Sequence, residues 1–248
     1  MGLRIFLHAV RLVFSQLNDA LRISGLLYLV TVVLSFFSFY SLWQAGSGGM
    51  ASFSWQLLLS ALVTGVIYLW IAVCWHRFVL LDEMPATPVP TFHGDRMLAY
   101  FGRGIQLALI VAVLGLVLGF ANGMLFQFVG ASPPILIIGT LIMLSIILLV
   151  TYRLAPVFPG AAVGRSVGVG AAWAATSGAS GTLLVLAVVS AIAAVVIDLP
   201  AQLIAALFPQ GLIVSFIWLS VTAWVKLMVG ISILTALYGV YVEKRTIA

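Results

Sequence analysis

Two charged side chains stand well inside apolar segments of this 248-residue chain, away from the segment ends, and their signs are opposite. Lys226 lies near the middle of the apolar run 215–241, and Asp198 lies within the run 182–207. A charged group at membrane depth costs roughly 2.5–3.5 kcal/mol on insertion scales, so each side chain needs a partner, a water-filled cavity or a route to the surface. An ammonium paired with a carboxylate relieves both costs. Asp198 and Lys226 are therefore the leading candidates for a site.

The two charged residues are expected at the same depth. Asp198 follows Thr182, at the start of its run, by 16 residues, and Lys226 precedes Tyr241, at the end of its run, by 15 residues. At about 1.5 Å per helical residue, these offsets are about 24 Å and 22 Å. Consecutive antiparallel helices would bring the side chains together, so we predict an ion pair. The alternatives are a lysine that reaches the outer headgroups alone and a pair that lines a transport pathway.

Two short strings match serine-nucleophile motifs. Residues 164–168, GRSVG, fit the G-x-S-x-G pattern of a nucleophile elbow, which needs a strand before the turn and a later histidine. Residues 178–181, GASG, resemble the serine motif of rhomboid intramembrane proteases, whose serine is paired with a histidine on the sixth helix. No histidine follows His93 here, so neither serine has a general base. We predict no catalytic residue and no enzyme.

A polar cluster surrounds the connection after the second apolar run. It contains imidazole and carboxylate groups, which are suitable metal ligands: His76, Asp82, Glu83, His93 and Asp95. Their spacing matches no metal signature, and the single Cys74 permits neither a cysteine zinc site nor an intrachain disulfide. Three nearby prolines favour an extended connector. We expect a solvated loop, with no metal and no cofactor.

The composition predicts a polytopic membrane protein. Hydrophobic residues make up 64% of the chain and charged residues 7%, and the mean hydropathy is +1.26, far from the composition of soluble domains. The net charge of +5 does not indicate a nucleic-acid partner, because the basic residues are scattered singly between apolar segments. The lipid bilayer is the expected partner, and a protein partner or a second copy of the chain stays open.

Six apolar runs are long enough to cross about 30 Å of hydrocarbon. They cover residues 23–43, 56–81, 104–128, 135–154, 182–207 and 215–241. Ten of the eleven basic residues fall on one side of the layout that these runs define, and the eleventh is Lys226. By the positive-inside rule, this predicts an all-α bundle of six transmembrane helices with both termini in the cytoplasm.

Residues 1–22 are expected to form an interfacial amphipathic helix. Apolar residues recur at helical spacing at Leu3, Phe6, Leu7, Val10, Phe14, Leu17 and Leu21, opposite a stripe of basic and polar residues. A cleavable signal peptide would have one uninterrupted apolar core instead. The helix is a surface anchor or, alternatively, senses lipid or docks a partner. We divide the chain into this helix and a membrane domain, residues 23–248.

Gly115, Gly119 and Gly123 fall on one face of the third run. Repeated G-x-x-x-G spacing lets two helix backbones approach closely in lipid. We therefore predict a helix-packing seam, with another helix of the same chain as the expected partner and a second copy as the alternative.

Related segments close the even-numbered runs: WHRFVLL at 75–81, TYRLAPVF at 151–158 and LYGVYVEK at 237–244. Each joins aromatic residues to a polar exit, which suggests three stacked helical hairpins. Residues 152–178, YRLAPVFPGAAVGRSVGVGAAWAATSG, and residues 233–245, ILTALYGVYVEKR, resemble segments of bacterial six-helix inner-membrane proteins related to the membrane domain of glycerophosphoryl diester phosphodiesterases. In those phosphodiesterases, catalysis belongs to a separate soluble domain. The resemblance therefore implies a multi-pass module of the bacterial inner membrane without catalysis of its own.

Two classes of function follow from these observations. The first is a non-enzymatic scaffold, assembly or lipid-associated module, in which Asp198 and Lys226 form a structural pair. The second is a small transporter or channel, in which the pair lines the pathway. A hydrated cavity that reaches Lys226 would favour the second class.

Overall fold

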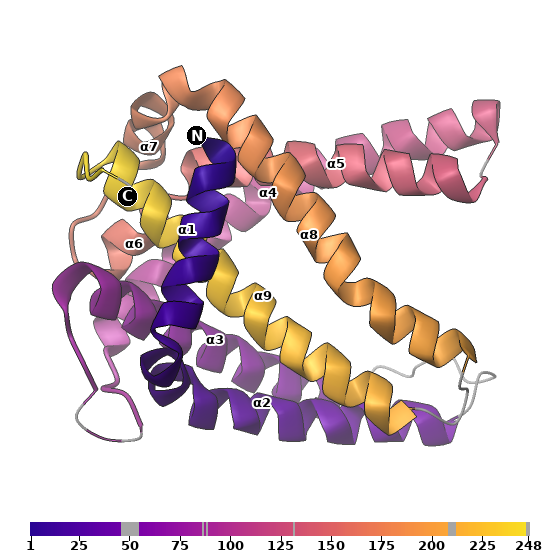
Figure 1. The fold of residues 1–248 in the computed structure, drawn as a ribbon, viewed down its shortest axis with the longest axis horizontal. Helices are drawn as coiled ribbons and strands as arrows, with labels where there is room; N and C mark the ends of the chain where they lie inside the picture. Colours follow the sequence, from indigo (N-terminus) through magenta and orange to yellow (C-terminus); the bar gives the residue numbers. More distant parts are fainter. Residues whose placement is uncertain (46–54, 86, 88, 131, 208–211, 247–248) are drawn as a thin grey trace.

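The chain folds into a bundle of long helices. A computed structural model describes residues 1–45, 55–85, 87, 89–130, 132–207 and 212–246 (Figure 1). All regular elements in these ranges are helical, and six are long and apolar enough to span a membrane, which confirms the predicted all-α, six-span architecture. The six are α2 Leu17–Ala45, α3 Trp55–Leu81, α4 Gly94–Val129, α5 Pro133–Leu154, α8 Ser180–Leu207 and α9 Leu212–Tyr241. The shorter elements are α1 Gly2–Ser15, α6 Val157–Ala162, α7 Val169–Ala175 and the 3₁₀ turn Ser177–Ala179.

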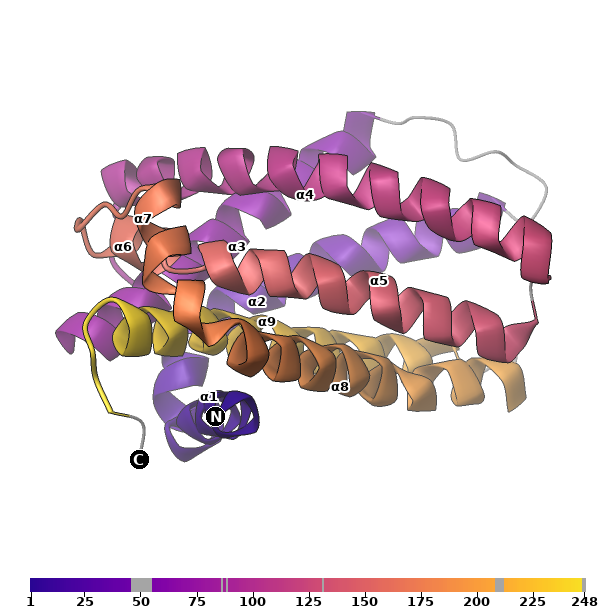
Figure 2. The same cartoon turned by 90° about the horizontal axis from the view of Figure 1, so that it is seen from above.

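Both chain termini lie at one end of the bundle, together with the 82–93 connection and the α6–α7 segment (Figures 1 and 2). We call this the termini end. Several helices extend beyond the apolar runs at this end, because hydropathy marks only the hydrocarbon-facing part of a helix. The clearest case is α4, whose 36 residues span about 54 Å at 1.5 Å per residue. Its first turns carry Arg96 and Arg103.

Helix α1 lies across the long helices and packs on α8 and α9 (Figure 2). Its buried face consists of Gly2, Ile5, Ala9 and Val13. Gly2 is essential to this contact, since a Cβ there would lie 2.8 Å from the backbone nitrogen of Leu186. The helix is therefore packed through small residues against the bundle.

The amphipathic helix ends earlier than predicted and packs on the bundle through its smaller side chains. It ends at Ser15 and α2 begins at Leu17, because Gln16 leaves the helical conformation with φ −115° and ψ 37°. The predicted boundary at residue 22 therefore falls inside α2. The large apolar residues Leu3, Leu7 and Phe14 also stay about half exposed, while the smaller side chains of α1 make the contacts with the bundle.

Helix α9 is held to its neighbours by polar side chains. The indole of Trp75 in α3 donates to the Ser232 hydroxyl at 2.9 Å, and the indole of Trp224 donates to Ser24 of α2 at 2.8 Å. Tyr28 of α2 also donates to the Ser220 carbonyl at 2.7 Å. In an apolar surrounding such bonds favour association, because each donor would otherwise be unpaired. Side-chain hydrogen bonds thus join α9 to both α2 and α3.

The α4–α5 pair lies apart from this core over much of its length and projects to the right in Figure 1. No described atom lies within 4 Å of a Cβ built at Gly115, Gly119 or Gly123. Within the described residues, no other helix therefore packs against these three glycines, and the expected seam with another helix of the chain is not found there. The close approach lies at Gly139 of α5, where a Cβ would be 2.7 Å from Asn122 Oδ1 and 3.0 Å from the Phe126 ring.

Candidate functional site

Helices α8 and α9 form the walls of a cavity of about 500 Å³, which α1 and α5 complete. We call it the α8–α9 cavity. Its lining residues are Phe6, Val10, Phe14, Leu144, Leu148, Tyr152, Ser190, Ala193, Ala194, Ile197, Val225, Lys226, Val229, Gly230 and Ile233. Alanines on α8 and Gly230 on α9 leave the space, because neighbouring side chains are too short to fill it. No described atom lies within 4 Å of a Cβ built at Gly230.

Lys226 contributes its side chain to this cavity and is paired with Asp198. The ammonium nitrogen lies 2.7 Å from Oδ1 and 2.8 Å from Oδ2 of the carboxylate, so the contact is bidentate. The side chains are 37% and 30% exposed, respectively. The structure thus brings together the two residues that matching depth had selected. Because the charges neutralise each other, the cavity carries no net charge at this point.

A second contact joins α8 and α9 near the same depth. Pro200 lies inside α8 and removes one backbone donor from the helix. The Trp218 indole of α9 donates to the Ile197 carbonyl of α8 at 3.1 Å. The two helices are therefore bound by a charged and a neutral hydrogen bond close together. Sequence reasoning missed Trp218, although an indole donor opposite a helix with an internal proline was an available signal.

The cavity walls are suited to hydrocarbon. Of the fifteen lining residues, only Lys226, Ser190 and Tyr152 carry polar side-chain atoms. Apolar walls make no hydrogen bonds to water or to a polar solute, so neither gains from entering. An acyl chain keeps favourable dispersion contacts there. The arrangement can therefore accept the apolar part of a lipid, with a charge pair at one end.

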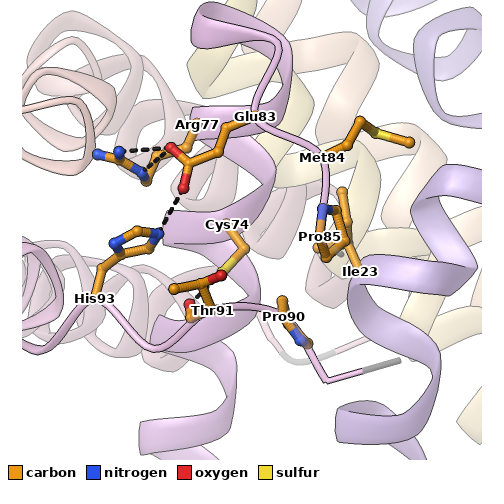
Figure 3. Close-up of a pocket in the computed structure, with 9 residues that line it drawn as sticks. All are labelled: Ile23, Cys74, Arg77, Glu83, Met84, Pro85, Pro90, Thr91 and His93. Carbon is orange, nitrogen blue, oxygen red and sulfur yellow. Dashed lines mark hydrogen bonds and ion pairs between the residues drawn. The ribbon is translucent and has the colours of Figure 1, made fainter. Parts of the chain in front are cut away.

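The polar cluster near the 82–93 connection forms a different kind of site (Figure 3). The Glu83 carboxylate accepts from Arg77 Nε at 2.8 Å and lies 2.8 Å from His93 Nε2. Burial pushes the pKa of Glu83 up, but the hydrogen bond and charge of Arg77 and the neighbouring His93 outweigh this, so the pKa lies below its ordinary value. The network ties the connection to the end of α3.

Of the five residues of the predicted polar cluster, only Glu83 and His93 are in contact, and the other three do not join them in one site. His76 is fully buried among helices, where Nδ1 lies 2.8 Å from Thr235 Oγ1 and Nε2 lies 3.3 Å from the Tyr100 hydroxyl. Asp82 adopts a positive φ of 53° at the end of α3, and Asp95 is exposed in the first turn of α4. Within the described residues, no three metal-ligating side chains form a group.

The two serine motifs lie at the termini end. Ser180 begins α8, and its hydroxyl accepts a hydrogen bond from the Arg153 guanidinium. Ser166 lies in the connection between α6 and α7. Neither motif follows a strand, because the elements before both are helices. The nucleophile elbow geometry is therefore not present at GRSVG.

Comparisons with protein-family models, with curated proteins and with solved structures find no match to this chain.

Proposed function

We propose that this chain is a non-enzymatic, lipid-associated membrane protein that holds the hydrocarbon chain of a lipid in the α8–α9 cavity. The observation that carries the proposal is the cavity itself: about 500 Å³, lined by apolar residues except at Lys226, Ser190 and Tyr152. This volume falls within the range of about 300–1,000 Å³ common for ligand pockets. A pathway for polar solutes would instead need groups that replace water along its length.

Helix α1 supports the same proposal. Phe6, Val10 and Phe14 line the cavity, while Leu3 and Leu7 are 50% and 52% exposed on the same helix. Large apolar side chains on an otherwise basic helix are typical of insertion at the bilayer surface. An acyl chain in the cavity would thus lie beside a helix already embedded among lipid headgroups.

The proposed orientation places the termini end in the cytoplasm of a bacterial cell, with the protein in the inner membrane. Ten basic residues lie on helix ends and connections at the termini end, which fits the positive-inside rule. The resemblance of residues 152–178 and 233–245 to bacterial membrane domains of the glycerophosphodiesterase type supports the inner membrane. In that setting the chain acts without catalysis of its own.

Photo-crosslinking tests lipid occupancy. Purified protein in nanodiscs that contain a phospholipid with a diazirine in its acyl chain is irradiated, and the labelled residues are mapped by mass spectrometry. We expect labelling of the cavity residues on α8 and α9 to exceed that of equally exposed residues on α4. Labelling in proportion to exposure alone would mean that only bulk lipid is sampled, and would contradict the proposal.

A matched pair of variants sharpens this test. Gly230→Leu places a side chain into the cavity without a clash at Cβ, and Gly65→Leu adds the same residue on α3, where a Cβ also meets no described atom. Both gain about 1 kcal/mol of helix propensity, so stability does not separate them. We expect Gly230→Leu to reduce cavity labelling several-fold and Gly65→Leu to leave it unchanged.

A transport role is the second candidate, because Lys226 borders the cavity and the Asp198–Lys226 pair is about one third exposed. A hydrated pathway would make the cavity walls reactive toward water-soluble reagents. Ala194→Cys in a Cys74→Ala background decides between the two. Under the lipid proposal, a membrane-impermeant maleimide does not label position 194 in liposomes, whereas rapid labelling would favour the pathway.

The orientation has its own test. In the Cys74→Ala background, Thr87→Cys lies in the connection after α3, and Ser132→Cys lies before α5 at the opposite end. In intact cells, an impermeant maleimide should label position 132 from outside and leave position 87 unlabelled until the membrane is opened. The reverse pattern would invert the topology. Gly48, in the first predicted external loop, lies outside the described residues.

A further inference from the structure

A second cavity lies at the termini end between α4 and the α6–α7 connection, and it shares no lining residue with the α8–α9 cavity. Its volume is about 530 Å³. The lining residues are Arg96, Ala99, Gly102, Arg103, Gln106, Ala161, Gly164 and Ser166. This set contains two guanidinium groups, a carboxamide and a hydroxyl, and no carboxylate. The electrostatic potential there is therefore positive.

The two arginines occupy one face of α4. Arg96 and Arg103 are seven residues apart, which is about two turns and about 10.5 Å along the helix. The small residues Ala99 and Gly102 lie between them and leave the hollow open. Two guanidinium groups at this spacing can bind one phosphate group with its attached ester, since arginine forms bidentate hydrogen bonds with phosphate oxygens.

The Arg96 guanidinium lies against the α6–α7 connection. A Cβ at Gly164 would lie 2.6 Å from Nη1 and 2.8 Å from Cζ of Arg96, so the side chain would have to shift if Gly164 were replaced. Gly164 also has a φ of +79°, which favours glycine. The connection thus packs on the guanidinium without offering it a carboxylate.

Neither Arg96 nor Arg103 forms an ion pair with an acid within the described residues. Glu83 is already paired with Arg77 and His93, and Glu243 is paired with Arg165 and Arg245. Arg103 donates through Nη1 to Gln106 at 3.0 Å, which orients the group and keeps its charge. Two positive charges in one hollow repel each other, so an anion between them is stabilised.

The opposite face of α4 indicates a membrane anion. Leu98, Phe101 and Ile105 are 71%, 48% and 45% exposed and lie in the same turns as the two arginines, on the other side of the helix. Such a face is unfavourable in water and favourable among acyl chains and lipid glycerol groups. Helix α4 at this level is therefore at the bilayer surface, which is the depth of lipid phosphates.

We propose that Arg96 and Arg103, together with Ser166 and Gly164, form a binding site for the phosphate of an anionic phospholipid headgroup. The site is independent of acyl-chain binding in the α8–α9 cavity. A lipid bound at this site would hold the α4–α5 pair and the α6–α7 connection at the membrane surface by electrostatic attraction. This attraction would add to helix packing, which alone leaves α4 exposed.

Native mass spectrometry of the full chain released from micelles tests the site. The probes are phosphatidylglycerol, phosphatidylcholine and inorganic phosphate. We expect phosphatidylglycerol to bind best, and Arg96→Gln/Arg103→Gln to weaken that binding about tenfold or more, the loss expected for charged hydrogen bonds. The control Arg11→Gln/Arg22→Gln removes the same charge from exposed positions on α1 and α2 and should change it less than twofold.

The outcomes separate the possible anions. Equal losses in the two double variants would overturn the site, since only total charge would then matter. Saturation by millimolar inorganic phosphate that displaces the lipid would overturn the lipid assignment in favour of a soluble anion. If the double glutamine variant does not fold, Arg96→Lys supplies the test, because it keeps the charge and removes the bidentate geometry. Unchanged binding there would contradict the proposal.

Discussion

Helices α9 and α4 are both apolar, yet they are packed in opposite ways. In the most apolar stretch of α9 the mean hydropathy is 1.8 and 39% of the residues are buried, whereas in α4 the hydropathy is 2.5 and only 6% are buried. The less apolar helix is thus the more buried one. In a bilayer the lipid tails are as apolar as the side chains, so a helix gains little by burying an apolar face. Helices therefore associate through close packing and polar contacts. Serines and indoles of α9 provide those contacts, and the long apolar side chains of α4 do not.

The largest expected difference between the two regions comes from one aromatic residue in each. Trp75 is fully buried and donates to Ser232, while Phe120 on α4 is 72% exposed. Trp75→Ala should lower the free energy of unfolding by about 3–5 kcal/mol, because it leaves a cavity and an unpaired hydroxyl. Phe120→Ala should change it by less than about 0.5 kcal/mol. Reversible unfolding in mixed micelles measures both, and similar losses would show that α4 is as tightly packed as α9.

The charge pair gives the next largest effect. Lys226→Met and Asp198→Asn should each reduce the free energy of unfolding by about 1–3 kcal/mol, less than for a fully buried pair because the side chains are partly exposed. The double variant should recover most of the loss, since no uncompensated charge then remains. Strictly additive losses in this double-mutant cycle would show that the pair does not bind α8 to α9.

Two glycines separate internal packing from free surface. Gly139→Leu places a side chain against Asn122 and Phe126, and we expect a loss of about 1–3 kcal/mol from overpacking. Gly119→Leu meets no described atom and should melt like the parent in detergent monomers. If Gly119→Leu instead weakens a dimer in nanodiscs, measured by single-molecule photobleaching, Gly115, Gly119 and Gly123 pack against a second copy. Equal melting of both variants as monomers would contradict the assignment of the α4–α5 contact.

The smallest expected effect is a pH dependence at the 82–93 connection. The pKa of Glu83 lies below its ordinary value of 4.5, so its ion pairs stabilise the fold above about pH 4.5 and are lost as the pH falls through the folded-state pKa. The side chain is about one third exposed, so the contribution should stay below about 1 kcal/mol. Glu83→Gln should therefore flatten the melting profile between pH 3 and 5, and a profile identical to that of the parent would exclude this network as the cause.

The number and class of the membrane-spanning helices were predictable from the sequence, whereas the short helices α6 and α7 were not predicted. Six long apolar runs each reach the hydrocarbon thickness, and a backbone in lipid must satisfy its hydrogen bonds internally, which leaves helices as the available structure. Helix ends were less predictable, as α1 and α4 show, because a helix continues past the apolar residues into the interface.

Parts of the candidate site were also within reach of the sequence. Asp198 and Lys226 stand out because charges are rare in apolar runs, and the fixed rise of the helix relates their positions to depth. The cavity beside them was not predictable, since it arises from short side chains on α8 and α9 that face each other only after folding. The same holds for Arg96 and Arg103, whose hollow needs the α6–α7 connection.

The sequence by itself thus determined what each segment can be, and the tertiary structure decided which faces meet. Apolarity, charge placement and helical rise are properties of one segment and its solvent. The choice of Gly139 over Gly119 for close packing, and of Gly2, Ile5 and Ala9 over Leu3 and Leu7 for burial, depends on which neighbour approaches. Both faces of a membrane-spanning helix are apolar, so hydropathy is the same for the packed side and the free side. Only complementary shapes and hydrogen bonds distinguish the two sides.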